Sequence, residues 1–294
     1  MAALLASLGG VLLPAASAQA QAQSKPRSSN EVVLKLLIPR PEGANAEIRR
    51  LKHTEMARMA SERIERRLSH AGVKDFRVEV EPHGILRVTA HSSMDSDTIA
   101  GIVIPRGQME LRPLVATGSD WTSIADAIPS DIELRQDIDS LDAQNAYLWS
   151  NRREVLESFV NRISLGEAQV FVYPDEGGWR SLTLGPSLAN HNDLQQVHRK
   201  TTPSGVPFVL LELRDDVAHR MRQSLQISES SHLAVVLDGE IVATLRFSAE
   251  RISSHLELSC PPHLRNSRAQ NTWVTQVAGR LAAPIPIVLA ELKE

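Results

Sequence analysis

This chain of 294 residues has few of the residues that crosslink or anchor a protein. It contains a single cysteine, Cys260, so it cannot form an internal disulfide and depends on its core for stability. Aromatic residues make up only 4% of the chain, which leaves aliphatic side chains to build that core. The formal net charge of −3 argues against nucleic acid as a partner, because phosphate binding needs a concentrated basic surface.

Long apolar runs are missing as well. A membrane-spanning helix needs about 20 consecutive apolar residues, and no stretch of this chain is that long. The nearest candidate is Leu4–Leu13, and small residues follow it up to Ala22. This pattern is typical of a secretory signal peptide over 1–22, followed by a polar linker over 23–30. The usual basic residues before the apolar stretch are absent, so a disordered leader is the alternative. The signal interpretation predicts a periplasmic protein without a membrane span.

The common catalytic and nucleotide-binding motifs do not occur in this sequence. The closest approach to a metal-ligand set is His191, Asp193 and His198. That spacing does not place both histidines on one face of a helix, and residues 190–193 are more typical of a turn with a cap.

Cys260 and His263 lie on either side of two prolines, which favours a constrained loop over a catalytic pair. A nucleophile also needs a base and an orienting group, and no such set is visible at readable spacing. We therefore expect no catalytic, cofactor-binding or metal-binding residue, and a protein that is not an enzyme.

Apolar periodicity predicts an α+β fold for the first part of the chain. A long helix is expected over 46–70, where apolar residues recur at three- and four-residue spacing, and Gly72 suits its C-terminal end. The other elements expected here are strands at 31–38, 76–80, 86–90 and 108–115, and a short helix around 99–103.

The middle of the chain is less regular and is expected to be an insertion. A helix is predicted over about 140–164, because Leu148, Val155 and Phe159 fall at helical spacing. The elements expected after it are strands at 169–173, 182–184, 206–213 and 256–259, helices at about 215–225 and 267–281, and a terminal strand at 284–291.

The stretch His232–Phe247 has the sequence HLAVVLDGEIVATLRF, two apolar runs joined by Asp238-Gly239. An Asp-Gly pair in this setting predicts a hairpin, because a type I′ turn needs positive φ at both central residues.

This hairpin, the helix that follows it and the tail Arg280–Leu292 resemble the first periplasmic domain of SecD, the protein-export subunit that works with the bacterial translocon. The stretch Met56–Val73 is similar to that family's long helix ending in Arg-Arg-Leu before Gly-Val. Glu110-Leu111-Arg112 stands where the family has an acidic, an apolar and an arginine residue.

The resemblance implies a base subdomain formed by both ends of the chain and a head subdomain inserted into it, with mostly antiparallel sheets and packed helices. The expected organisation is base (first part) at 31–115, connecting and inserted region at 116–181, head at 182–266 and base (last part) at 267–294.

The function implied by the resemblance is that of a non-enzymatic, exported protein-binding module, accessory to protein export. Its expected partners are unfolded or exported polypeptide and translocon components, held in an apolar cleft between base and head. Basic residues of the 46–70 helix suggest a peripheral membrane contact, although a solvated helix surface is favoured. The alternative is a structural or scaffolding envelope protein of the same fold, in which the 140–164 helix forms a partner surface.

Overall fold

The predicted α+β class is confirmed by a computed structural model, in which the sheets of the described residues are antiparallel and helices pack against them. The predicted signal peptide (1–22) and residues 23–29 of the predicted linker lie outside the described residues. None of the helices in the described part of the chain is long and apolar enough to cross a membrane. The structure describes residues 30–42, 45–115, 121, 123–136, 146–163, 168–228, 232–246 and 253–292.

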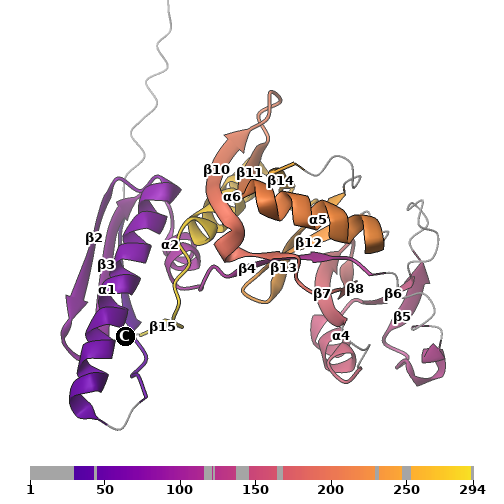
Figure 1. The fold of residues 1–294 in the computed structure, drawn as a ribbon, viewed down its shortest axis with the longest axis horizontal. Coiled ribbons are helices and arrows are strands. Elements are labelled where there is room, and N and C mark those ends of the chain that lie inside the picture. Colours follow the sequence, from indigo (N-terminus) through magenta and orange to yellow (C-terminus); the bar gives the residue numbers. More distant parts are fainter. Residues whose placement is uncertain are drawn as a thin grey trace, which may run out of the picture.

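The first unit is a sheet of order β15-β1-β3-β2 with two helices packed against one face (Figure 1). The tail strand returns to the sheet that begins near the N-terminus, since Leu36 pairs with Glu291. The two ends of the described chain therefore lie in one sheet, as the resemblance implied. Its elements are β1 (Asn30–Leu37), α1 (Ala46–Ala71), β2 (Asp75–Glu81), η1 (Pro82–Gly84), β3 (Ile85–Ser92), α2 (Ser96–Val103) and β15 (Ala290–Glu291).

Both ends of α1 follow local sequence signals. Asn45 accepts a hydrogen bond from the backbone N–H of Glu47 (2.8 Å), as an N-cap residue does. Gly72 has φ +84° and its N–H donates to the last turn, which is the left-handed C-terminal geometry expected from the sequence.

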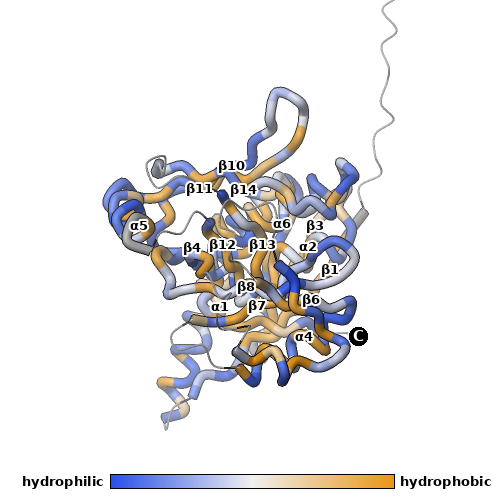
Figure 2. The backbone as a smooth tube through the Cα atoms, turned by 90° about the vertical axis from the view of Figure 1, so that its right-hand side faces the viewer, coloured by the Kyte–Doolittle hydropathy of each residue, from blue (hydrophilic) through white to orange (hydrophobic). Residues whose placement is uncertain are grey.

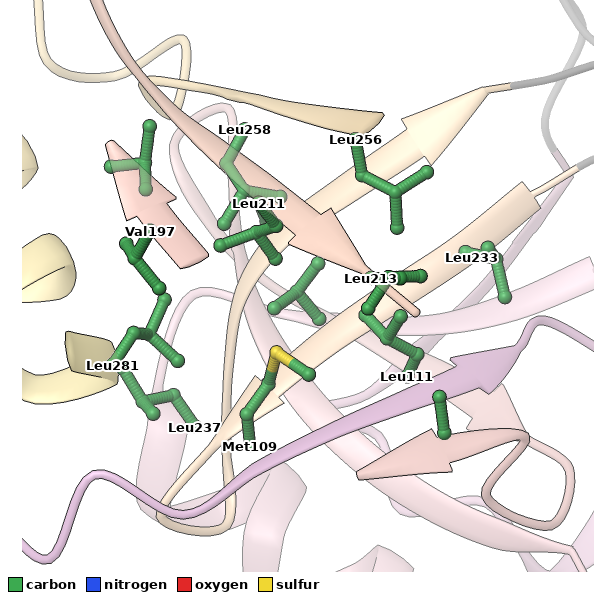
Figure 3. Packing of buried hydrophobic residues seen from close by; sticks show 14 of the residues in the cluster. Met109, Leu111, Val197, Leu211, Leu213, Leu233, Leu237, Leu256, Leu258 and Leu281 are labelled. Atoms are coloured by element: carbon green, nitrogen blue, oxygen red, sulfur yellow. The ribbon is translucent and has the colours of Figure 1, made fainter. Parts of the chain in front are cut away.

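The second unit contains two sheets, of order β10-β11-β14 and β13-β12-β4-β9. Side chains from both sheets and from α6 meet in one aliphatic core (Figure 3). In Figure 2 hydrophobic segments of β12 and β13 lie in the middle of the molecule. The elements are β4 (Met109–Pro113), β9 (Ala189–Asn190), η3 (His191–Asp193), β10 (Leu194–Thr201), β11 (Pro207–Leu213), α5 (Asp215–Ser228), β12 (His232–Leu237), β13 (Glu240–Arg246), β14 (His255–Ser259) and α6 (Ser267–Ala282).

The position of β4 differs from the grouping predicted from sequence. Residues 31–115 were expected to form one part of the base, but β4 leaves the first sheet and pairs with β12, with Leu111 opposite Val235. The alternation of apolar and polar residues in β4 gives it one buried face, and this pattern fits either sheet equally well. Long-range pairing, which the local pattern does not encode, decides the partner.

The third unit is a sheet of order β5-β6-β8-β7 with α4 packed against it. The predicted 140–164 helix is wrong, because a strand and a short helix occupy its described residues. Leu148 and Ser150 are buried while Tyr147 and Trp149 are only partly buried, which is the period of a strand. Residues 140–145 and 164 lie outside the described part. The elements are η2 (Ala125–Ala127), β5 (Glu133–Gln136), β6 (Ala146–Ser150), α4 (Arg153–Val160), β7 (Gln169–Asp175) and β8 (Gly178–Leu184).

The three units follow one another along the longest axis of the molecule, with the second unit in the middle (Figure 1). Helix α6 contacts α1 and α2 of the first unit as well as β10 and β11 of the second. On the other side, the end of β4 pairs with the end of β8 through Leu114 and Leu184. The second unit is therefore joined to each neighbour by continuous packing.

Candidate functional site

The predicted hairpin turn is confirmed, since Asp238 and Gly239 have φ of 56° and 86°. The Asp238 carboxylate accepts hydrogen bonds from the N–H groups of Gly107 (2.9 Å) and Gln108 (2.8 Å). It also pairs with Arg280 of α6, whose Nη2 lies 2.6 Å from Oδ2. The turn is thus fixed to the segment before β4 and to α6. We call this set of contacts the Asp238 junction.

Electrostatics at the Asp238 junction favour the ionised carboxylate. Burial alone would raise the pKa of Asp238, but the hydrogen bond from Arg280 and those from the two backbone N–H groups hold it below its ordinary value. The carboxylate is therefore charged at neutral pH and serves as an acceptor.

Arg67 of α1 lies beside this junction and is fully buried. Its guanidinium donates to the carbonyl oxygens of Ala283 (2.6 Å), Ile102 (2.9 Å) and Arg106 (2.5 Å), and also to that of Pro105. Burial lowers the pKa of Arg67 to about 9, and the charge of Arg280 adds to this effect while Asp238 opposes it. Arg67 therefore binds α1 to the end of α2 and to the chain after α6.

Gly107 sits where these groups converge. Its φ is +76°, and a Cβ atom there would lie 2.2 Å from the carbonyl oxygen of Arg280 and 2.6 Å from Arg67 Nη2. Only glycine fits this backbone conformation and this space. The Asp238 junction therefore holds the hairpin turn, the segment before β4 and α6 together.

The residues considered as metal ligands are not brought together. Asp193 accepts from the backbone N–H of Asn190 (2.9 Å) in a capping box, as expected for a turn and cap. It also pairs with Arg214 (3.2 Å). His198 lies on β10, with its Nε2 3.8 Å from Glu212 Oε2. The described residues contain no group of three or more side chains that could hold a metal ion.

Cys260 behaves as a packed thiol. Its Sγ lies 3.4 Å from the carbonyl oxygen of Pro207 and 3.8 Å from that of Gln270. Burial raises the pKa of this thiol, which disfavours the reactive thiolate.

Two cavities lie between the first and second units, on either side of shared α6 residues. One of about 510 Å³ is lined by the start of α2 and by α6. The other, of about 430 Å³, is lined by the end of α1, β10 and α6. Both share Asn271 and Thr275 and are lined mainly by polar side chains. The apolar cleft expected between these units is therefore replaced by a polar one.

A third cavity, of about 450 Å³, has more apolar residues in its lining, although most of its exposed surface is polar, and it lies between the second and third units. We call it the β7 groove. It runs along β7, which stands at the edge of its sheet. Its apolar walls come from α4 and β7, and its far side from the hairpin turn at Gly239 and Glu240. The apolar lining residues are Val160, Ile163, Ala168, Val170, Phe171 and Val172.

The charged residues at the rim of the β7 groove are one arginine and two glutamates, so the rim carries a small net negative charge. Arg153 pairs with Glu157 (2.6 Å) on its own helix and with Glu240 (3.3 Å) across the groove. These contacts raise the pKa of Arg153, first through Glu157. Sequence analysis missed this groove, because five of its twelve lining residues come from the region assigned to a long helix.

No protein-family model and no curated protein matches this chain. Among solved structures, it is similar to SecDF in the super-membrane-facing form, with a TM-score of 0.50 and 15% sequence identity over 91% of this chain and 30% of that chain. It is also similar to a structure described as a membrane component SecDF that enhances protein export, with a TM-score of 0.47 and 16% identity over 90% of this chain and 99% of that chain. A SecDF structure from Thermus thermophilus gives a TM-score of 0.32 and 15% identity over 90% of this chain and 30% of that one.

The first of these comparisons supports a SecD-like fold for the chain. The chain spans about 30% of the length of that SecDF chain.

Proposed function

We propose that this chain is an exported, non-enzymatic protein-binding module that resembles the first periplasmic domain of SecD and holds extended segments of unfolded polypeptide. The observation that carries the proposal is the β7 groove on a SecD-like fold, since the groove combines an edge strand with several apolar side chains in its lining. In this proposal the first unit corresponds to the base and the second to the head, and α6 contributes to both.

An edge strand binds extended chain through its backbone. Strand addition uses the unpaired N–H and C=O groups of the edge and places alternate side chains of the guest in pockets. Such recognition depends little on the sequence of the bound segment, which suits a module that binds many different unfolded chains.

The two ends of β7 differ in the backbone hydrogen-bond donors that they can present to an added strand. Pro174 pairs in register with Trp179 and lacks a backbone donor, so an added strand gains less there. The part of β7 that lines the groove, residues 169–172, contains no proline. We therefore place the bound segment along 169–172, between α4 and the β12–β13 turn.

The rim of the groove is only weakly charged. One arginine, Arg153, faces two carboxylates, so the groove should disfavour strongly acidic guests and accept neutral or basic ones. Backbone hydrogen bonds along β7 then supply most of the affinity, and the apolar side chains add roughly 25 cal/mol for each Å² of apolar surface removed from water.

Site-specific photocrosslinking tests this function. A benzophenone amino acid is placed at Asn161 or Ala168, which line the groove, and at the exposed Gln223 on α5 as the control. The guest is a reduced and alkylated model protein that stays unfolded in buffer, compared with the same protein in its folded, disulfide-bonded form.

The groove positions should crosslink the unfolded guest and not the folded one, while Gln223 crosslinks neither. Equal crosslinking from Gln223, equal crosslinking of the folded guest, or no crosslink at all contradicts the proposal. The translocon as a partner and the periplasm as the location belong to the same proposal, and pull-down from periplasmic extract with the Ala168 crosslinker tests them.

The scaffolding alternative loses the feature that motivated it. It depended on an amphipathic helix over 140–164, and β6 occupies residues 146–150 of that range. No specific observation in the described residues favours it over a binding role.

A further inference from the structure

The cavity at the C-terminal end of α1 is lined, among the described residues, by several basic residues and by no carboxylate. It measures about 430 Å³ and lies between α1, β10 and α6. The basic residues His70, His198, Arg199 and Lys200 line it, and no aspartate or glutamate is among the described lining residues. We call it the α6 cavity.

Arg199 is held in place by neutral oxygens. Its Nη1 donates to the carbonyl oxygen of Ala71 (3.0 Å) and contacts Thr275 Oγ1 at 3.5 Å. Within the described ranges, no carboxylate forms an ion pair with this guanidinium. It is therefore oriented at the mouth of the cavity with its charge uncompensated.

His70 in the wall is disfavoured as a cation, by burial first and by the neighbouring charges second. Burial lowers the pKa of His70, and the charges of Arg199 and His198 lower it further. His70 Nε2 also has no hydrogen-bond partner in the described part of the structure. Glu212 lies 3.8 Å from His198 and offsets the charge of that residue when it is protonated. The cavity is thus unfavourable for further positive charge and favourable for an anion.

We propose that the α6 cavity binds a phosphate group, with Arg199 as its charged contact, Lys200 as a second positive charge beside it on β10, and Asn271 and Thr275 as polar contacts. A guanidinium fork and an ammonium group are the contacts that phosphate oxygens form most strongly in proteins. The volume exceeds that of phosphate alone, and the adjoining cavity along α6 leaves room for a group attached to it. In that second cavity the one acid, Asp95, faces Arg268 at 3.5 Å.

Phosphate chemistry has two sources here, a soluble phosphate compound and the headgroup of an anionic lipid. The first arm of the test titrates inorganic phosphate into the isotope-labelled full chain and follows the backbone amide resonances of residues 198–201. The second arm measures flotation with phosphatidylcholine vesicles, with and without phosphatidic acid. Each arm compares Lys200→Gln with Lys52→Gln, which removes the same charge from the other end of α1.

We expect saturable shifts at 198–201 in the millimolar range, and a dissociation constant raised about threefold to tenfold by Lys200→Gln and unchanged by Lys52→Gln. Arg199→Gln should have a larger effect, and Lys200→Gln keeps the test valid if that variant fails to fold. Shifts without flotation identify a soluble phosphate compound. Flotation that requires phosphatidic acid and is weakened by Lys200→Gln identifies the lipid headgroup. No response in either arm, or equal loss in Lys200→Gln and Lys52→Gln, overturns the proposal.

Discussion

Replacement of Asp238 by asparagine should cost the protein about 2–4 kcal/mol of unfolding free energy at pH 7. The variant keeps a residue that tolerates positive φ, so the turn itself is little strained. It removes the charge that pairs with Arg280, and both side chains of that pair are less than one fifth exposed, at 18% and 17%. Breaking a fully buried pair costs about 3–5 kcal/mol, and the partial exposure here lowers that figure.

The pH dependence gives this prediction a second readout. Because the folded-state pKa of Asp238 is lowered, the stabilisation is fully present above the ordinary value of 3.8 and is lost as the pH falls through the folded-state pKa. The difference between wild type and Asp238→Asn should therefore shrink below about pH 4.

Urea denaturation followed by circular dichroism measures both effects, with an expected midpoint shift of roughly 1 M at pH 7. Asp131→Asn is the control, since its pair with Arg152 is more than half exposed on both sides and should contribute less than about 1 kcal/mol. A loss below about 1 kcal/mol for Asp238→Asn, or a difference that stays constant into acid, would refute the role given to this carboxylate.

Three further outcomes follow from the same structure. Arg67→Lys should destabilise the protein by about 3 kcal/mol or more in urea denaturation, because one ammonium group cannot reach the four carbonyl oxygens that the guanidinium binds; a loss near zero would contradict it. Gly107→Ala should cost more than about 3 kcal/mol, whereas Gly177→Ala, which also has positive φ but nothing within 4 Å of the added carbon, should cost only about 1 kcal/mol. Cys260 should react with an aromatic disulfide reagent at pH 8 at least about threefold more slowly than free cysteine, because burial raises its pKa; an equal rate would show an exposed thiol.

Local signals predicted the elements whose own residues fix them. The turn at Asp238-Gly239, the end of α1 at Gly72 and the alternation in β3 all depend on neighbours in sequence, and each is found as expected. The strand β10 has only Val197 as a buried residue and forms because it pairs with β11, so its sequence gave no apolar pattern to detect.

Tertiary contacts explain the larger errors. Leu148 and Phe159 fall at helical spacing, yet one lies in a strand and the other in a short helix that packs on the same core. The burial of Arg67 could not be predicted from the sequence either, because an arginine in a basic helix is ordinarily exposed. The β7 groove and the α6 cavity are lined by several elements that lie far apart in the sequence, so no motif could mark them.

The pairing of β1 with β15 has a mechanical consequence. Only Leu36 and Leu37 of β1 are in register with β15, so tension applied between residues 30 and 292 is resisted at first by this short ladder. Strand β15 would detach first, while Ile285 and Leu289 stay buried in the core of the first unit and α6 stays anchored through Arg280 to the hairpin turn and by packing against α1. The molecule would thus yield in two steps, first at β15 and only at higher force at α6, which packs against both the first and the second unit.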